Sequence, residues 1–501
     1  MGKEGAIWSE PNWWQVACAA FVLCLATATM APAQSLTTLY NFCAQSQCPD
    51  GYYPYAGLLQ ATDGNFYGTT ANGGTSLYAG TIFKITPSGT LTTLYSFCSQ
   101  SNCSDGYRPF ASLLQAMDGN FYGTTIFGGA TRGECSGGCG TVFKITSSGT
   151  LTTLYSFCSQ SGCTDGSWPG DSLVQAADGN LYGTASSGGP GNYGTVFKTT
   201  SGGTLTTLNG FNGADGARPT TAGVVRGTDG NFYGTTLYGG ANAAGAVFKI
   251  TPSGTLTTLH SFCSQGGCAD GEWPYAGLLQ ATDGNLYGTT HLGGPYGGGT
   301  IFKITPSGTL TLLYSFCSQS QCTDGQEPFA GLIQATDGNF YGTTQLGGAQ
   351  GAGTAFEITP SGTLTTLYSF CSQSGCTDGQ QPFAGLVQAT NGNFYGTTVF
   401  GGTHCQPIYE CGGTVFVLST GLGPFVEALP TFGAVGKRVE ILGNDLTGAS
   451  SVTFNGTAAT FTVVSPSLIT TAAPAGATTG YIQVVTPQRT LTSNVVFRVL
   501  P

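Results

Sequence analysis

One loop position varies between residue types that recognise ligands. The motif DGxxP occurs seven times in the chain, and the residue directly before its proline differs from copy to copy. Aromatic residues stack on sugar rings, while arginine, glutamate and glutamine bond hydroxyls and carboxylates. Two interpretations remain open: a ligand-binding position, which we take as the candidate site, or an exposed position under no constraint. These seven residues are Tyr53, Arg108, Trp168, Arg218, Trp273, Glu327 and Gln381.

The same motif places an aspartate in every copy. A ring of carboxylates would suit Ca²⁺, but an aspartate before glycine also caps its own turn through a local hydrogen bond. A single ion would not need the same residue in all copies, so we favour the turn role and predict no metal site. The loop aspartates are Asp50, Asp105, Asp165, Asp215, Asp270, Asp324 and Asp378.

Sixteen of the eighteen cysteines form close pairs in the sequence. In the fourth copy of the repeated text, FNGADG replaces FCSQSGCTDG and both cysteines are lost together, which indicates that they are partners. We predict eight local disulfides, each worth roughly 2 kcal/mol, and therefore an oxidising compartment. A metal site would need four converging ligands, and no C-x4-C pair has a histidine beside it. The predicted pairs are Cys43 and Cys48, Cys98 and Cys103, Cys135 and Cys139, Cys158 and Cys163, Cys263 and Cys268, Cys317 and Cys322, Cys371 and Cys376, and Cys405 and Cys411.

Catalytic constellations are weak in this sequence. The acid and base candidates are Asp171, Glu272, Glu327 and His291, which are scattered over different copies of the repeat. His260 stands where most copies have tyrosine, which suggests a substitution within a strand. No serine nucleophile elbow or phosphate-binding loop followed by a helix is present. We therefore predict no enzyme activity and no cofactor.

The variable loops belong to a unit repeated seven times. The aspartate of a second turn, DGN, recurs from Asp63 to Asp337 with Asn391 in the seventh unit, at spacings of 55, 60, 51, 54, 54 and 54 residues. Each unit contains four strand-like segments, such as GLLQAT, FYGTT, GTIFKIT and TLTTLYSF, joined by short turns. This pattern predicts an all-β fold, a seven-bladed β-propeller with four-stranded blades. A linear β-solenoid is the alternative.

The two ends of the repeat region are complementary. It opens with a fourth strand (36–42) that has no preceding partners, and it closes with a third strand (413–419) that has no successor. We expect the first segment to complete the last blade, which removes open sheet edges. Antiparallel order then puts all disulfide loops and insertions on one face, and the DGN and PSG turns on the other.

Composition and the two ends of the chain complete the domain prediction. The chain has 81 glycines, 8% charged residues and a net charge of -10, which favours strands and turns and argues against a nucleic-acid partner. Residues 1–33 resemble a secretory signal peptide, with an uncleaved anchor as the alternative. Residues 34–420 form the predicted propeller. Residues 421–501 lack the repeat and contain six or seven short strands, which predicts an immunoglobulin-like sandwich.

Both regions resemble known families. GNFYGTT followed by GTxFKITPSGTLTTLYSF resembles the GloVer (Gloeobacter/Verrucomicrobia) repeat of exported bacterial proteins, which implies a propeller over residues 36–419. The tail resembles an IPT/TIG domain through the VEILGNDL run and VTFNG, which implies an immunoglobulin-like module of surface or secreted proteins. Neither resemblance supplies a catalytic residue.

These observations predict a secreted or cell-surface protein, monomeric and without a transmembrane span once the signal is removed. Its expected role is non-catalytic binding of a glycan or a surface protein through the disulfide-bearing face. The alternatives are a hydrolase or lyase acting on extracellular polysaccharide, and a structural envelope protein. Fold alone does not decide among them.

Overall fold

The computed structural model describes residues 34–500 apart from 77, 131–134 and 407–409, and does not describe the side chains of 220–222, 405, 406 and 410. The predicted signal peptide, residues 1–33, lies outside the described residues. Within the described part, the protein is all-β, and no helix is long and apolar enough to cross a membrane.

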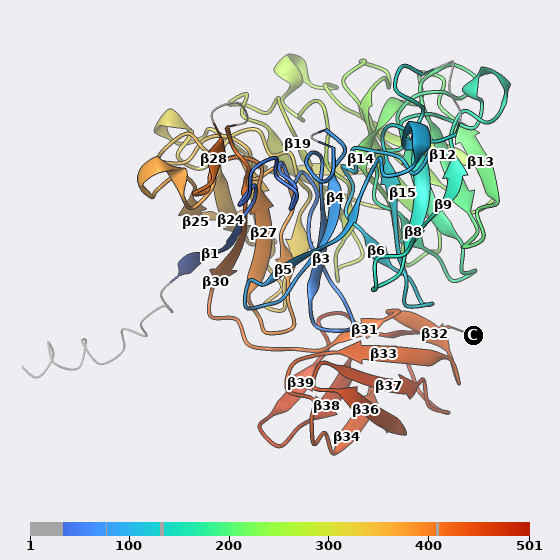
Figure 1. Ribbon diagram of the computed structural model, residues 1–501, viewed down its shortest axis with the longest axis vertical. Coiled ribbons are helices and arrows are strands. Elements are labelled where there is room, and N and C mark those ends of the chain that lie inside the picture. Colours follow the sequence, from blue (N-terminus) through green and yellow to red (C-terminus); the bar gives the residue numbers. More distant parts are fainter. Residues whose placement is uncertain (1–33, 77, 131–134, 407–409, 501) are drawn as a thin grey trace, which may run out of the picture.

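Four-stranded antiparallel sheets repeat along the chain and stand side by side (Figure 1). The first has the order β2 (Leu59–Gln60), β3 (Phe66–Thr70), β4 (Thr81–Ile85) and β5 (Leu91–Ser96). Five further sheets keep this order. Their strands are β6 (Leu114–Gln115), β7 (Phe121–Thr125), β8 (Thr141–Ile145) and β9 (Leu151–Ser156); β10 (Val174–Gln175), β11 (Leu181–Ala185), β12 (Thr195–Thr199) and β13 (Leu205–Gly210); β14 (Ala217–Arg226), β15 (Phe232–Tyr238), β16 (Ala246–Ile250) and β17 (Leu256–Ser261); β18 (Leu279–Gln280), β19 (Leu286–Thr290), β20 (Thr300–Ile304) and β21 (Leu310–Ser315); and β22 (Ile333–Gln334), β23 (Phe340–Thr344), β24 (Thr354–Ile358) and β25 (Leu364–Ser369).

One more sheet combines the two ends of the repeat region. Its order is β26 (Val387–Gln388), β27 (Phe394–Thr398), β30 (Thr414–Ser419) and β1 (Ser35–Asn41). Strand β1 pairs antiparallel with β30 from Ser35 opposite Ser419 to Asn41 opposite Thr414. The N-terminal strand therefore takes the outer position that β5 has in the first sheet. A short ladder, β28 (Cys405–Gln406) and β29 (Glu410–Cys411), lies in the loop between β27 and β30.

Aromatic side chains of the second strands join neighbouring sheets. Each of these strands is buried along its length, and the glycine after the tyrosine leaves room for a phenylalanine ring of the same sheet, as Gly68 does for Phe83. Tyr67 stacks on Phe121 of the next sheet with ring centroids 4.1 Å apart, and Tyr395 stacks on Phe66 at the same distance. Offset stacking adds about 0.5–1.5 kcal/mol to the burial of each ring. Hydrophobic contacts between sheets, rather than within them, therefore form most of the core.

The first strand is shorter than the sequence predicts in six of the seven sheets, and β14 is the exception with ten residues. GLLQAT was expected to be a strand throughout, but β2 contains only Leu59 and Gln60. The preceding carbonyl groups bond a different sheet: those of Pro54 and Ala56 accept hydrogen bonds from Thr397 Oγ1 at 3.1 and 3.3 Å. Contacts with the neighbouring sheet thus replace pairing within the sheet.

The sheets present two ends with different connections. One end, here called the loop face, carries the disulfide loops and the long second-to-third-strand loops. The other, the turn face, carries the Asp-Gly-Asn turns, where Asp63 accepts hydrogen bonds from the Asn65 amide and the Tyr67 hydroxyl. The only helical elements among the described residues are short 3-10 turns in the disulfide loops: η2 (Ser101–Cys103), η3 (Ser161–Cys163), η4 (Gly266–Cys268), η5 (Ser320–Cys322) and η6 (Ser374–Cys376).

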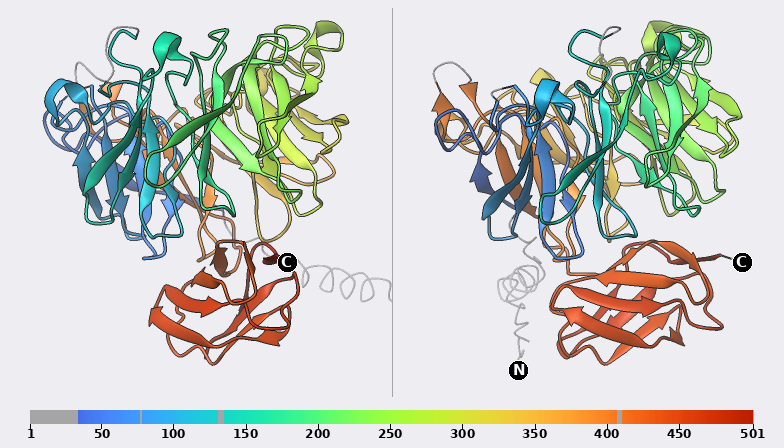
Figure 2. Two further views of the ribbon diagram at one scale, coloured as in Figure 1. Left: turned by 90° about the vertical axis from the view of Figure 1, so that its right-hand side faces the viewer. Right: turned by 45° about the vertical axis from the view of Figure 1, so that its right-hand side comes forward.

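The C-terminal region forms small sheets around a separate core, below the turn face (Figure 2). Ser467 Oγ contacts the Thr62 carbonyl at 3.5 Å, and the Arg226 guanidinium lies 4.4 Å from the ring centroid of Phe432. This region therefore leaves the loop face uncovered. Its strands are β31 (Glu427–Leu429), β32 (Phe432–Ala434), β33 (Arg438–Leu442), β34 (Ser451–Phe454), β35 (Thr457–Ala458), β36 (Phe461–Ser465), β37 (Leu468–Ala472), β38 (Ile482–Val485), β39 (Thr490–Thr492) and β40 (Arg498–Leu500).

Candidate functional site

The seven candidate ligand-binding residues share an unusual backbone conformation. Each has a positive φ, between 52° and 58°, although none is glycine. Each backbone N–H donates to a carbonyl in the loop of the preceding sheet: that of Arg108 to Ala79, and that of Gln381 to Ala352, both at 2.8 Å. The left-handed conformation costs a non-glycine residue of order 1 kcal/mol. Backbone hydrogen bonds between neighbouring sheets hold each residue in this conformation.

Most side chains at this position are partly buried, whereas an unconstrained surface position would leave them exposed. Arg218 is exposed, but the other six are half-buried. Tyr53 packs edge-on against Phe400 at 5.1 Å, and Trp273 packs against Tyr238 at 6.0 Å. These contacts reach across sheet boundaries, so each candidate residue sits between two neighbouring loops.

An arc of aromatic rings two residues further along surrounds a central cavity. Phe110, Tyr55, Phe383, Phe329 and Tyr275 follow one another, with successive centroid distances of 4.9, 5.2, 4.9 and 4.5 Å. They line a cavity of about 300 Å³ together with small residues such as Gly57, Ser112 and Gly385. Because its walls come from six different repeats, the cavity lies where the sheets converge.

The arc is open on one side. Gly170 occupies the position equivalent to Tyr55 in the third unit, and Ile126 and Ser172 line the cavity there. The neighbouring Asp171 stands where five of the six other units have alanine, and its side chain is buried with no described partner for Oδ2. Burial raises the pKa of the Asp171 carboxyl well above its usual value. A buried carboxyl whose ionisation is disfavoured by burial therefore lies beside the gap in the arc.

The candidate residues form an outer tier around this arc. Tyr53 lies 6.4 Å from Tyr55 between ring centroids. On the opposite side, His291 packs edge-on against Tyr275 at 5.1 Å, and its Nε2 lies 3.8 Å from Glu327 Oε2. None of the seven lines the central cavity directly. The structure therefore places them outside the cavity wall.

Burial shifts the pKa values of titratable groups around the cavity in the direction that favours their neutral forms. Burial raises the pKa of Tyr275, as does Tyr238, while Arg218 opposes this. Burial likewise raises the pKa of Tyr55, against the effect of Arg108. For His291, burial lowers the pKa and the negative charge of Glu327 offsets part of this shift. The result is an uncharged wall with arginines and a glutamate at its periphery, which suits a neutral, polyhydroxylated ligand.

The loop aspartates bond within their own loops. Asp105 accepts hydrogen bonds from the Tyr95 hydroxyl at 2.8 Å and from the amide and hydroxyl of Ser99 at 3.0 and 3.1 Å. His260 replaces the tyrosine in one copy, and its Nε2 lies 2.9 Å from Asp270 Oδ2. The buried carboxylates are thus used as turn anchors, and their oxygens are not arranged around a common point.

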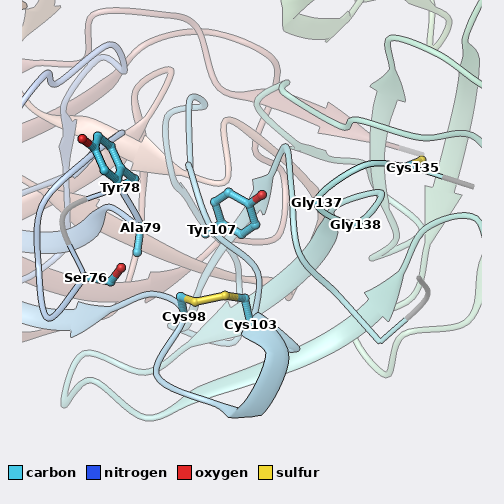
Figure 3. A pocket seen from close by; sticks show the side chains of 9 residues that line it. All are labelled: Ser76, Tyr78, Ala79, Cys98, Cys103, Tyr107, Cys135, Gly137 and Gly138. Atoms are coloured by element: carbon cyan, nitrogen blue, oxygen red, sulfur yellow. A yellow bond between two sulfur atoms is a disulfide. The ribbon is translucent and has the colours of Figure 1, made fainter. Parts of the chain in front are cut away.

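Disulfides close the loops of this face. Seven of the eight predicted pairs are bonded in the structure, from Cys43–Cys48 to Cys371–Cys376. In the eighth pair, the side chain of Cys405 lies outside the described part of the chain. A second cavity of about 350 Å³ lies between these loops, with Tyr78, Tyr107 and the Cys98–Cys103 disulfide in its wall (Figure 3). Covalent loop closure therefore shapes the surface of this face.

The aromatic arc was not recognised from the sequence. The residue after the loop proline is aromatic in five of seven units, and those units are consecutive around the repeat: Tyr275, Phe329, Phe383, Tyr55 and Phe110. Near-constant residues in a repeat suggest framework, whereas variable ones suggest recognition. The consecutive run, broken only by Gly170 and Thr220, was the signal that could have located this cavity.

These features define an all-β repeat protein with propeller-like sheets and a C-terminal immunoglobulin-like module. The chain belongs to the Gloeobacter/Verrucomicrobia repeat family, whose model matches four overlapping stretches, residues 26–226, 100–269, 168–409 and 221–461. Residues 425–499 match the IPT/TIG domain. Both family resemblances seen in the sequence are confirmed.

Solved structures resemble the chain at low sequence identity. A fungal alcohol oxidase of the AA5 family, in complex with copper, is 12% identical with a TM-score of 0.50, covering 94% of this chain and 100% of that chain. Virginiamycin B lyase from Staphylococcus aureus is 15% identical with a TM-score of 0.49, covering 77% and 99%. At these identities the likeness to the oxidase concerns the fold alone. No curated protein matches the chain by sequence.

Proposed function

We propose that this chain is an exported, non-catalytic binding protein whose central cavity takes a glycan on the loop face of a closed, seven-bladed ring. The arc of five aromatic rings around the cavity carries this proposal. Apolar faces of sugar rings stack on aromatic side chains, and the neutral wall imposes no charge on the ligand. A cavity of about 300 Å³ is at the small end of ligand sites, which suits one or two sugar units.

Contacts between the last and first sheets support ring closure. Besides the stacking of Tyr395 on Phe66, the Thr390 amide donates to Gln60 Oε1 at 2.9 Å. The same bond joins other neighbouring sheets, for example from the Thr62 amide to Gln115 Oε1 at 2.9 Å. A closed ring gives every sheet a neighbour on both sides and leaves only short, protected sheet edges, and it gives the cavity a continuous wall.

The outer tier adds polar contacts to this site. Arg108, Arg218 and Glu327 surround the aromatic arc and would bond hydroxyls or carboxylates of a longer chain that extends beyond the cavity. A protein ligand would use the same tier without entering the cavity. The disulfide-closed loops suit a protein working outside the cytoplasm, where such bonds persist.

A binding comparison tests the cavity. The oxidised full chain is applied to a glycan array beside the double variant Y275A/F329A, with Y296A as control because Tyr296 is exposed on the same face. We expect the double variant to lose about tenfold or more in affinity for the bound glycan, equivalent to about 1.4 kcal/mol or more. The control should bind as the wild type does. Glycan binding that survives in Y275A/F329A would rule out the cavity, and no binding to any glycan would shift the role to a protein ligand.

The His291–Glu327 pair favours one alternative, an enzyme acting on polysaccharide. A histidine beside a carboxylate at the edge of a cavity is suited to proton transfer. Of the other sequence candidates, Asp171 is buried beside the gap and Glu272 lies near the Cys268 sulfur at 3.9 Å. Release of new reducing or unsaturated ends from polysaccharides, lost in H291A and in E327Q, would favour this function over simple binding.

A further inference from the structure

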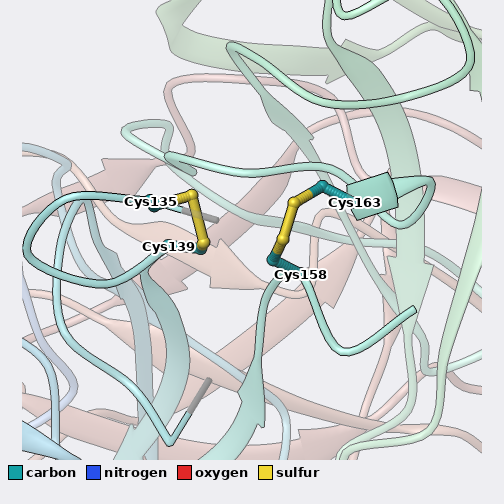
Figure 4. A group of neighbouring side chains, drawn as sticks. All are labelled: Cys135, Cys139, Cys158 and Cys163. Atoms are coloured by element: carbon teal, nitrogen blue, oxygen red, sulfur yellow. A yellow bond between two sulfur atoms is a disulfide. The ribbon is translucent and has the colours of Figure 1, made fainter. Parts of the chain in front are cut away.

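Four cysteines from two separate loops converge at one place on the loop face. Cys135 and Cys139 lie in the insertion between β7 and β8, and Cys158 and Cys163 follow β9 of the same sheet. Their sulfur atoms all lie within 4.8 Å of one another, and the two disulfides lie side by side (Figure 4). Among the described residues, this is the only group of three or more histidine, cysteine or acidic side chains close enough to hold a metal ion.

The backbone holds both loops independently of the disulfides. The Cys139 carbonyl accepts from the Trp168 amide at 2.8 Å, which ties the insertion to the next repeat. The Cys163 carbonyl accepts from the amides of Gly166 and Gly189, both at 2.9 Å. Cys139 and Cys163 are buried and the other two cysteines are half-buried. These backbone hydrogen bonds do not depend on the disulfides, so we expect the four sulfur atoms to stay close together when the disulfides are reduced.

Four thiolates at this spacing match the preference of a soft cation. Zinc in structural sites is held tetrahedrally by four sulfurs at about 2.3 Å, which puts neighbouring sulfurs about 3.8 Å apart. We propose that Cys135, Cys139, Cys158 and Cys163 form a tetrathiolate site for Zn²⁺ or a similar soft divalent cation when both disulfides are reduced. The site has two mutually exclusive states, two disulfides or one metal ion. It is separate from the central cavity and does not depend on the binding function.

A dithiol is a reductant that can convert the two-disulfide state into the metal-binding state with electrons and protons balanced. Two dithiol molecules give four electrons and four protons to the two disulfides, and each dithiol closes to its own disulfide. The four cysteine thiols then release four protons as their sulfurs bond the metal ion. Oxidation reverses both steps and expels the metal. Metal binding is therefore favoured by reducing conditions and by higher pH.

Other loops supply the matched control. Cys371 and Cys376 have the same C-x4-C spacing and also form a disulfide, but no second pair lies beside them among the described residues. Two thiolates alone do not complete a tetrahedral site. Removing this pair changes the number of cysteines without touching the proposed site.

The test measures zinc bound by the full chain after reduction with a water-soluble phosphine, which does not compete for zinc as a dithiol would. Bound zinc is counted after gel filtration for the wild type, C135S/C139S, C158S/C163S and C371S/C376S. We expect both of the first two variants to lose one equivalent of zinc relative to the wild type, and C371S/C376S to lose none. With Co²⁺ in place of zinc, the visible bands of a tetrahedral cobalt–thiolate centre should be missing in the same two variants.

Several results would overturn the site. They are a wild type that binds no zinc, equal zinc in the wild type and C135S/C139S, or an equal loss in all three variants. Because C135S/C139S and C158S/C163S alter different loops, loss of the same equivalent in both is not explained by misfolding of one loop. Circular dichroism of each oxidised variant checks that the sheets are retained.

Discussion

Tyr395 of the last sheet stacks on Phe66 of the first at 4.1 Å, the same distance that separates Tyr67 from Phe121 within the array. The contact that would close the ring is thus geometrically equal to one between consecutive repeats. In an open array, a contact between the two ends would contribute little to stability, because the ends could separate without unfolding a sheet.

Ring closure can be measured by comparing two phenylalanines. Both Phe66 and Phe121 are 1% exposed, and replacing a buried phenylalanine by alanine costs about 3–5 kcal/mol. In a closed ring, F66A and F121A should reduce the free energy of unfolding by similar amounts, as measured by denaturant titration. A cost for F66A below about half of that for F121A would indicate an open array.

The His291–Glu327 pair predicts a shift in a histidine titration. Burial lowers the pKa of His291 and Glu327 partly restores it. The variant E327Q removes the restoring charge, so the pKa of His291 should fall further, as followed by NMR of the ring protons. The chain has only three histidines, which keeps the signals separable. E272Q serves as the control and should leave the His291 titration unchanged; an unchanged titration in E327Q would mean that the two groups do not interact.

Asp171 should reduce stability as the pH rises. The position holds alanine in other units, such as Ala276 and Ala330, and a buried polar atom with no described partner, as Asp171 Oδ2 is, costs about 1–3 kcal/mol. The folded pKa is raised, so the folded protein keeps a proton that the unfolded chain releases above about pH 4. The contribution of Asp171 to the free energy of unfolding therefore becomes less favourable as pH rises above that value.

The variant D171A should be more stable than the wild type at pH 7, by about 1–3 kcal/mol, and the gain should shrink toward pH 4. Thermal melts at both pH values measure it. The reciprocal variant A330D should be destabilised. A loss of stability in D171A would show that the carboxyl has a partner and a structural role.

Much of the local structure was accessible from the sequence because turns and strands repeat with the same residues. Short strands were predicted for the C-terminal region, and the structure has them, for example β33 (Arg438–Leu442) and β37 (Leu468–Ala472). The expected partner of the N-terminal strand is also the observed one, since β1 pairs with β30. Alternation of buried and exposed residues, together with glycine at the turns, carries this information locally.

Contacts between repeats were not accessible in the same way. The positive φ of Glu327 or Gln381 is imposed by a hydrogen bond to the preceding sheet, and no glycine marks it in the sequence. The cluster of Cys139 with Cys163 depends on an insertion folding over the next loop of the same sheet. Such features depend on how the units pack against one another. No local pattern in the repeated sequence gives the distance in space between different loops.

The turn aspartates should make the protein sensitive to acid. Burial tends to raise the pKa of Asp283, but hydrogen bonds from Asn285, Lys303 and Tyr287 outweigh this and lower the pKa to about 2. The stabilising effect is complete above the unfolded value of about 4, and it is lost as pH falls from there through about 2. D283N should therefore lower the melting temperature at pH 6, and the difference from the wild type should vanish near pH 2. Asn391, which occupies this turn in the seventh unit, shows that asparagine is sterically accepted; a difference that is independent of pH would exclude the charge as its cause.

The left-handed conformation at the candidate position predicts that glycine is tolerated there and that a β-branched residue is destabilising. Gln381 has φ 54°, where glycine is unstrained and a β-branched side chain is strongly disfavoured. In denaturant titrations, Q381G should be neutral or stabilising by up to about 1 kcal/mol, whereas Q381V should destabilise by about 1–2 kcal/mol. The neighbouring Gln380 pairs in an extended bridge with Phe400, so Q380V should stay within about 0.5 kcal/mol of the wild type. If Q381G proved as destabilising as Q381V, the glutamine side chain itself would stabilise the loop. The position would then have a structural role rather than a ligand-binding role.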